Sequence, residues 1–269
     1  MNKIFPIYNG TYRISFNGLG RVPTVEAPNF VFLVQTADEE FILFDTGYDP
    51  ATLPGVGSVG FQEKHQRIVP MLRSLGLDPN DIGLVVMSHL HWDHAAAMSC
   101  FPRARFHVQA RELQGMLHLS PKTKRNYYYP EHFMSSLERM DLQDGAHNLR
   151  PGIDVYVTGD HTYGHQILRI QTDAGVFVLA ADSMANHDQL WSSLSAANWE
   201  EYHQGVGRGF YWPEDTLLPA LENCLRRQGF PTAINEFIPP MSHAEIKALG
   251  KLIMSHDPRL SRNNRHTLW

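Results

Sequence analysis

The stretch His89-Leu90-His91-Trp92-Asp93-His94 places three imidazoles and one carboxylate within six residues. It follows an apolar run, residues 82–87, that is typical of a buried strand. In extended chain His89 and His91 point to the same side, because they are two residues apart. Asp93 and His94 would open the next helix and reach a second point nearby. The motif therefore predicts ligands for two adjacent cations, since imidazole and carboxylate suit zinc, and also iron, cobalt or manganese.

A polar surface loop that is merely rich in histidine is the alternative interpretation of this motif. An exposed loop would not need an apolar strand leading into it, which favours the metal site.

The H-x-H-x-D-H run resembles the signature of the metallo-β-lactamase superfamily. Three later stretches resemble the places where that family carries its other ligands: Gly164-His165 before an apolar strand, Asp182 at the end of residues 176–181, and His256 after residues 252–255. The Phe44-Asp45-Thr46-Gly47 stretch resembles its early D-T-G turn. Together these matches run in the family's order from about Val31 to His256.

The resemblance implies two sets of metal ligands joined by a bridging carboxylate. These are His89, His91 and His165 for the first metal, Asp93, His94 and His256 for the second, and Asp182 for the bridge. It also implies that Asp45 and His161 support the site from behind the ligands. The loop departs from the family's usual T-P-G-H at Gly159-Asp160.

The same resemblance implies the chemistry of two bridged divalent cations, with zinc preferred. Water held between them is acidified, to a pKa of about 7 for zinc, and the resulting hydroxide attacks an electrophilic carbon or phosphorus. Asp93 is the candidate for carrying a proton to the leaving group, and Asp182 is the second candidate catalytic residue. A ligand without a proton role is the equally weighted alternative for Asp93.

Composition narrows the class of protein. The chain has 269 residues and shows no linker or low-complexity run, so we expect one metallo-β-lactamase-like domain over residues 1–269. The net charge of −5 argues against a nucleic-acid surface. The two cysteines, Cys100 and Cys224, are typical of reduced thiols in a cytoplasmic protein, and no apolar stretch is long enough for a signal peptide or a membrane span.

Local patterns predict many strands mixed with helices, which fits the family's α/β fold, an αββα sandwich. The expected strands are residues 11–16, 29–36, 40–45, 83–87, 105–108, 153–157, 166–171, 176–181 and 251–254. A helix is expected over residues 62–75, with Pro70 marking a kink or a later start. Ser242 and Glu245 form a capping box that opens a short helix.

The substrate is expected to be a small molecule, because subfamily resemblance points to the N-acyl-homoserine lactonase and 4-pyridoxolactonase group. The expected reaction opens a lactone ring or cleaves a related cyclic or activated ester. Those lactonases carry a tyrosine three residues after the bridging aspartate, where this chain has Ala185. Tyr163 is a candidate replacement, and a tyrosine packed beside the loop is the favoured alternative.

Aromatic-rich insertions near residues 112–150 and 187–215 supply candidate pocket walls, including Tyr128 and Trp191. An aromatic mini-core or a dimer surface is the alternative, and a monomer or a homodimer is expected. Arg21 is a candidate for binding a substrate carboxylate. Rival functions on the same fold are thioester or phosphoester hydrolysis, and a mononuclear iron dioxygenase that acts on persulfides.

Overall fold

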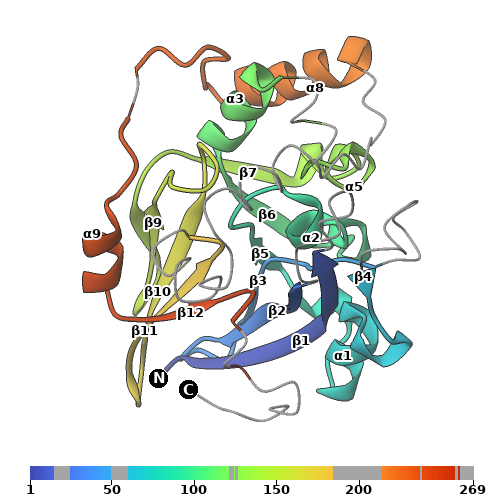
Figure 1. Cartoon of the computed structure of the whole chain (residues 1–269), viewed down its shortest axis with the longest axis vertical. Helices are drawn as coiled ribbons and strands as arrows, with labels where there is room; N and C mark the ends of the chain where they lie inside the picture. The colour runs from blue at the N-terminus through green and yellow to red at the C-terminus, as the bar shows by residue number, and fades with distance from the viewer. Residues whose placement is uncertain are drawn as a thin grey trace.

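In the computed structural model two β-sheets face each other, and helices lie against both outer faces (Figure 1). The structure describes residues 1–14, 25–49, 60–120, 124, 127–183, 214–236, 238–257 and 260. Over these ranges one sheet has seven strands in the order β4-β1-β2-β3-β5-β6-β7. The other has five in the order β12-β11-β10-β9-β8. This architecture confirms the predicted αββα sandwich.

The seven-stranded sheet is formed by β1 (Lys3–Ile14), β2 (Val25–Gln35), β3 (Phe41–Phe44), β4 (Gly60–Phe61), β5 (Leu84–Val86), β6 (Arg105–Gln109) and β7 (Met140–Gln143). The five-stranded sheet is formed by β8 (His147–Arg150), β9 (Ile153–Val157), β10 (Gln166–Thr172), β11 (Gly175–Ala181) and β12 (Lys251–Met254). The helices are α1 (Ile68–Ser74), α2 (Trp92–Ala95), α3 (Ala110–His118), α5 (Pro130–Met134), α8 (Glu214–Arg227) and α9 (His243–Ala248).

Alternation of side chains along the strands produces three layers of buried apolar residues. In β2, Phe32 and Val34 face the five-stranded sheet, whereas Val31 and Leu33 face the layer that contains α1, α2, α3 and α8. In β11, Phe177 and Leu179 face the inter-sheet layer, and Val178 and Ala180 pack with Ile246 of α9. Each sheet therefore buries both faces, which fixes the strand register and with it the positions of the strand ends.

The residues predicted to form or support the metal centre follow the ends of strands. β3, β5, β6 and β7 are parallel, and so are β11 and β12. Asp45 follows β3, the H-x-H-x-D-H run follows β5, the 158–165 loop joins β9 to β10, and Asp182 and His256 follow β11 and β12. Backbone bonds from Gln166 N–H to the Ser88 carbonyl (2.9 Å) and from Ser255 N–H to the Ala181 carbonyl (3.1 Å) bring these ends together.

The structure corrects two predicted elements. The helix expected over residues 62–75 begins only at Ile68, after a short 3-10 turn at Lys64–Gln66. Pro70 therefore lies in the first turn of α1, where its missing N–H has no intrahelical partner to lose. The strand expected at residues 11–16 is the end of the longer β1, which begins at Lys3.

The 112–150 range, predicted as an insertion, contains part of α3 together with α5, β7 and β8, so part of it belongs to the two sheets. Most of the 187–215 range lies outside the described residues, and so do Arg21, Ala185 and Trp191. Both cysteines carry free thiols. Among the described helices, none combines the length and the apolar character needed to cross a bilayer.

Candidate metal centre

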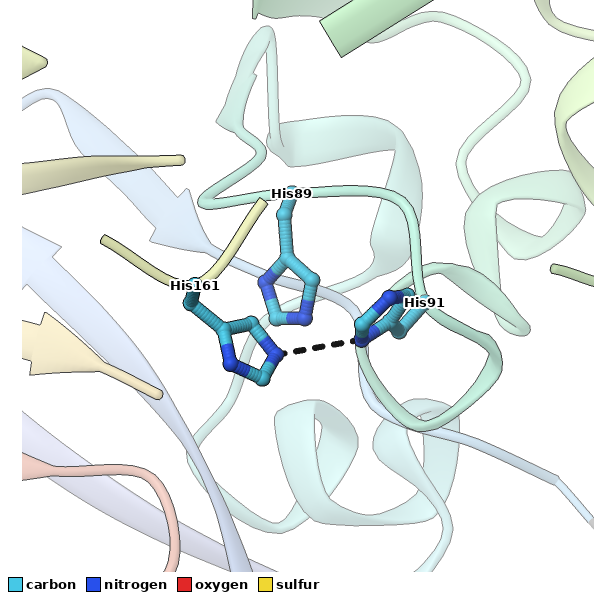
Figure 2. Close-up of side chains that lie close together, drawn as sticks. All are labelled: His89, His91 and His161. Atoms are coloured by element: carbon cyan, nitrogen blue, oxygen red, sulfur yellow. Dashed lines mark hydrogen bonds between the residues drawn. The ribbon is translucent and has the colours of Figure 1, made fainter. Parts of the chain in front are cut away.

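A first group of nitrogen donors is formed by three histidines from two loops. His89 and His91 come from the loop after β5, and His161 comes from the loop between β9 and β10. One ligand atom from each lies within 4.8 Å of the other two. His161 Nε2 is 3.2 Å from His91 Nδ1, and the three rings converge (Figure 2). This is the spacing expected of imidazoles arranged around one cation.

A second group lies beside the first and is richer in carboxylate. It consists of Asp93 and His94 in α2, Asp182 after β11 and His256 after β12, again with ligand atoms within 4.8 Å of one another. The His94 and His256 Nε2 atoms are each 3.2 Å from Asp182 Oδ1, and His256 Nε2 is 3.5 Å from Asp93 Oδ2. Two imidazoles and two carboxylates suit a hard or borderline divalent cation.

Asp182 faces both groups at once. While its Oδ1 atom points to His94 and His256, its Oδ2 atom lies 3.7 Å from His161 Nε2. The carboxylate therefore has one oxygen directed to each group.

Asp45 anchors the loop after β5 from behind. Its carboxylate accepts hydrogen bonds from the Ser88 N–H (2.7 Å) and the Ser88 hydroxyl (2.8 Å), and Oδ2 lies 2.8 Å from His94 Nδ1. The Ser88 hydroxyl in turn lies 2.9 Å from His89 Nδ1. Both rings thus have Nδ1 engaged, which leaves Nε2 directed to the centre. Ser88 was missed by the sequence analysis, because its type and position alone do not distinguish it from any buried serine.

The 158–165 loop reverses the predicted roles of its two histidines. We expected His165 in the first group and His161 behind it, but the structure brings His161 into the group and leaves His165 outside it. His165 is buried, and its Nδ1 lies 2.6 Å from the Thr158 hydroxyl. That hydroxyl also donates to Asp160 Oδ1 at 2.6 Å.

Backbone hydrogen bonds explain this exchange. The Thr158 N–H donates to the His165 carbonyl (2.8 Å), and the His165 N–H donates to the Thr162 carbonyl (3.0 Å). His165 is therefore paired back to the base of the loop, whereas His161 sits at its tip. Gly159 turns the chain with a φ of 60°, a conformation that glycine adopts without strain.

The two groups differ in electrostatics. Burial lowers the pKa of His91 well below its usual value and brings the pKa of His161 to about 4, so the first group is neutral at pH 7. Burial also acts to lower the pKa of His256, but the carboxylates of Asp182 and Asp93 outweigh it and raise that pKa to about 9. The second group therefore holds protons that a bound cation would displace.

The donor atoms fit divalent cations. His89 Nε2 is buried and has no hydrogen-bond partner within the described part of the chain, and His94 Nε2 faces Asp182 Oδ1 at 3.2 Å. A buried imidazole nitrogen without such a partner costs free energy unless a ligand satisfies it. These nitrogens converge with two carboxylates. A pair of metal ions is therefore the simplest ligand that would satisfy them.

A pocket of about 370 Å³ opens beside the first group. Its lining consists of His91, Glu112, Gly115, Met116, Leu119, Tyr127, Tyr128, Asp160, His161, Thr162 and Tyr163. The Tyr127 ring stacks on His91 at 5.1 Å, and Tyr128 meets the same ring edge-on at 4.9 Å. Tyr128 and Tyr163, both predicted as pocket residues, thus lie in its wall. The Tyr163 hydroxyl donates to the Glu236 carbonyl at 3.2 Å. It is therefore not directed to the metal centre, as a replacement for the lactonases' tyrosine would have to be.

Comparison with known proteins gives one consistent result. A family model described as the metallo-beta-lactamase superfamily matches residues 24–222. N-acyl homoserine lactonase AiiA from Bacillus thuringiensis subsp. kurstaki is 30% identical over 184 residues, which cover 64% of this chain and 70% of that protein. N-acyl homoserine lactonase AiiB from Agrobacterium fabrum is 31% identical over 126 residues, which cover 39% of this chain and 45% of AiiB.

Solved structures share the fold. An N-acyl homoserine lactone hydrolase with N-hexanoyl-L-homoserine bound at its catalytic metal centre superimposes with a TM-score of 0.64 and 21% identity, covering 96% of this chain and 94% of that chain. The dizinc lactonase AidC superimposes with a TM-score of 0.59 and 15% identity, covering 96% of this chain and 88% of AidC.

Proposed function

Because this chain belongs to the metallo-β-lactamase superfamily, as the match over residues 24–222 shows, we propose that it is a dinuclear hydrolase that opens a lactone ring. It is a metal-dependent hydrolase of that superfamily, with lactonases among its homologues. The observation that carries the proposal is the pair of adjacent donor groups joined by Asp182.

We assign the metal ligands by the geometry of the two groups. The first cation would be held by His89, His91 and His161, the second by Asp93, His94 and His256, and Asp182 would bridge them. His165 moves to a supporting position beside Thr158. Zinc is the proposed metal, since imidazole and carboxylate ligands suit it. Iron, cobalt and manganese also bind such ligands.

Bound cations would supply an acidified water molecule and a Lewis acid for the carbonyl oxygen of the substrate. The chain's own groups prepare for this chemistry. Asp45 and Ser88 hold His94 and His89 with Nε2 facing inward. Asp93 is the proposed carrier of a proton to the leaving alkoxide, because its Oδ2 atom lies 3.5 Å from His256 Nε2 and so faces the centre.

The pocket supports a neutral substrate with a flat or apolar part. Two tyrosine rings contact His91, and Met116 and Leu119 add apolar surface. The described lining residues carry two acids, Glu112 and Asp160, and no lysine or arginine. Such a wall disfavours phosphodiesters and other anions, whereas a lactone carries no charge.

The proposal is tested by elemental analysis of the purified protein together with a substrate panel. The panel contains aromatic-fused lactones, acyl-homoserine lactones, thioesters and phosphodiesters, compared by kcat/KM. We expect two divalent cations per chain and the highest kcat/KM for a lactone. One tightly bound iron with oxygen consumption on a persulfide would instead establish the dioxygenase, and preference for a phosphodiester or a thioester would also refute the lactonase assignment.

A further inference from the structure

Glu112, a buried carboxylate in α3, joins the two loops that supply the first histidine group. It is 1% exposed. Its Oε1 atom accepts a hydrogen bond from the Leu90 N–H at 3.0 Å, and Leu90 lies between His89 and His91. Its Oε2 atom accepts from the Thr162 hydroxyl at 2.6 Å and from the Gly164 N–H at 3.2 Å. One side chain therefore holds backbone from both loops.

Two glycines permit this close approach. A Cβ atom on Gly164 would lie 2.2 Å from the Glu112 nitrogen, and a Cβ atom on Gly115 would lie 2.8 Å from the Tyr163 Cβ. Any other residue at either position would force the 158–165 loop away from α3. The contact between the loop and Glu112 is thus built into the backbone packing of α3.

Glu112 also reaches the pocket wall. Glu112 and Tyr128 line the same pocket, and the Tyr128 ring lies 4.9 Å from the His91 ring. The carboxylate therefore accepts hydrogen bonds from the loop after β5 and the 158–165 loop, and it lies in the wall of the pocket beside His91.

We propose that Glu112 is a positioning residue, which fixes His91 and His161 at the separation that a single metal ion requires. A carboxylate has about four lone-pair positions and carries no hydrogen, so it can accept from Leu90, Thr162 and Gly164 together. A glutamine has one acceptor oxygen, and its amide N–H₂ would face at least one of these donors. This inference rests on the proposed metal centre.

The effect expected is on metal affinity, because groups that orient ligands typically change it by about 10–100-fold. Glu112→Gln should weaken the binding of one of two Co²⁺ ions by about that factor and should alter the visible absorption of the Co²⁺-loaded protein. Glu138→Gln is the matched control. Its carboxylate is exposed and pairs with Arg227 of α8, not with either of the two loops.

The measurement is a titration of metal-free protein with Co²⁺, followed by absorbance, with a thermal melt to show that each variant is folded. A second series covers the case that Glu112→Gln does not fold. Thr162→Val removes one bond to Glu112 and should weaken one Co²⁺ site by a smaller factor, whereas Thr162→Ser should restore it. Thr172→Val is its control, because the Thr172 hydroxyl bonds Gly175 in the β10–β11 turn.

The outcomes separate this inference from the proposed function. If the unaltered protein binds two Co²⁺ ions, and folded Glu112→Gln and Thr162→Val bind them with the same affinities and spectrum, the positioning role is overturned. If the unaltered protein binds no Co²⁺, the metal centre itself fails, and the positioning role fails with it.

Discussion

The Oδ2 atom of Asp182 lies 3.7 Å from Nε2 of His161, although the two residues come from separate loops of the five-stranded sheet. The Oδ1 atom of the same carboxylate faces His94 and His256 at 3.2 Å. The two donor groups therefore share one side chain, so a substitution at Asp182 should affect metal binding at both.

Replacing Asp182 with alanine should remove activity and reduce the metal content from two ions per chain to less than one. Loss of the carboxylate deprives both groups of an oxygen and leaves the His94 and His256 rings without the charge that raises their pKa values. Elemental analysis after gel filtration measures the content. Retention of two ions in a folded Asp182→Ala variant would show that this residue does not bridge.

His161→Ala and His165→Ala should differ in their effects on metal content and on activity. His161→Ala removes a donor from the first group, so we expect one ion fewer per chain and a loss of activity of several orders of magnitude. His165→Ala removes a residue that touches Thr158, so metal content should stay near two, with a loss in kcat/KM of about 10–100-fold. The reverse pattern in metal content would restore the roles predicted from sequence.

The fold could be predicted because short motifs carry the family resemblance, and the same motifs named most of the residues that the structure brings together. The H-x-H-x-D-H run fixes its own geometry through the strand before it and the helix after it, and Asp45, Asp182 and His256 each end a recognisable strand. The choice between His161 and His165 could not be made this way. Both lie in one loop, four residues apart, and only its backbone pairing decides which ring reaches the centre.

Glu112 was beyond sequence reasoning for a different reason. Its partners lie 22, 50 and 52 residues away along the chain. A single glutamate in the first turn of a helix is ordinarily solvated, and its charge interacts favourably with the helix dipole. Only tertiary packing, through Gly115 and Gly164, turns it into a buried acceptor.

Asp45→Asn should lower metal affinity while leaving the protein folded. The amide would place a donor N–H₂ where the carboxylate accepts from Ser88 and faces His94 Nδ1. The His94 ring would then lose the partner that keeps Nε2 directed inward. We expect a 10–100-fold weaker affinity for the second cation, measured by competition with a chelator. Asp154→Asn, in a half-buried ion pair with Arg169, is the control and should leave the affinity unchanged.

The His107–His147 pair should make stability depend on pH. The His107 and His147 Nε2 atoms lie 2.9 Å apart, linking β6 to β8, and burial lowers the pKa of His107 to about 4. The unfolded chain takes up this proton near pH 6.5, so the folded state loses stability as pH falls from about 6.5 to 4.

His107→Gln should therefore reduce the loss in the free energy of unfolding between pH 7 and pH 4.5, by up to about 2 kcal/mol. Urea denaturation of the metal-free protein at both pH values measures the difference. His118→Gln, at an exposed position in α3, should keep the slope of the unaltered protein. An unchanged slope in His107→Gln would mean that other groups cause the acid sensitivity.

Tyr127→Ala should raise KM for the best aromatic-fused lactone by about 2–10-fold, with kcat nearly unchanged. The Tyr127 ring stacks on His91 and lines the pocket, so a flat substrate at the centre would contact its face. Aromatic contacts of this kind contribute about 0.5–1.5 kcal/mol, and binding that is equal in ground and transition states appears in KM alone.

Tyr127→Phe keeps the ring and should retain the original KM. Tyr163→Phe removes only a hydroxyl that bonds Glu236 and should also leave KM unchanged. Steady-state kinetics on aromatic-fused and long-chain acyl-homoserine lactones then decide between pocket shapes. A KM that rises only for the long-chain substrate would show that the pocket binds an acyl chain instead of a flat ring.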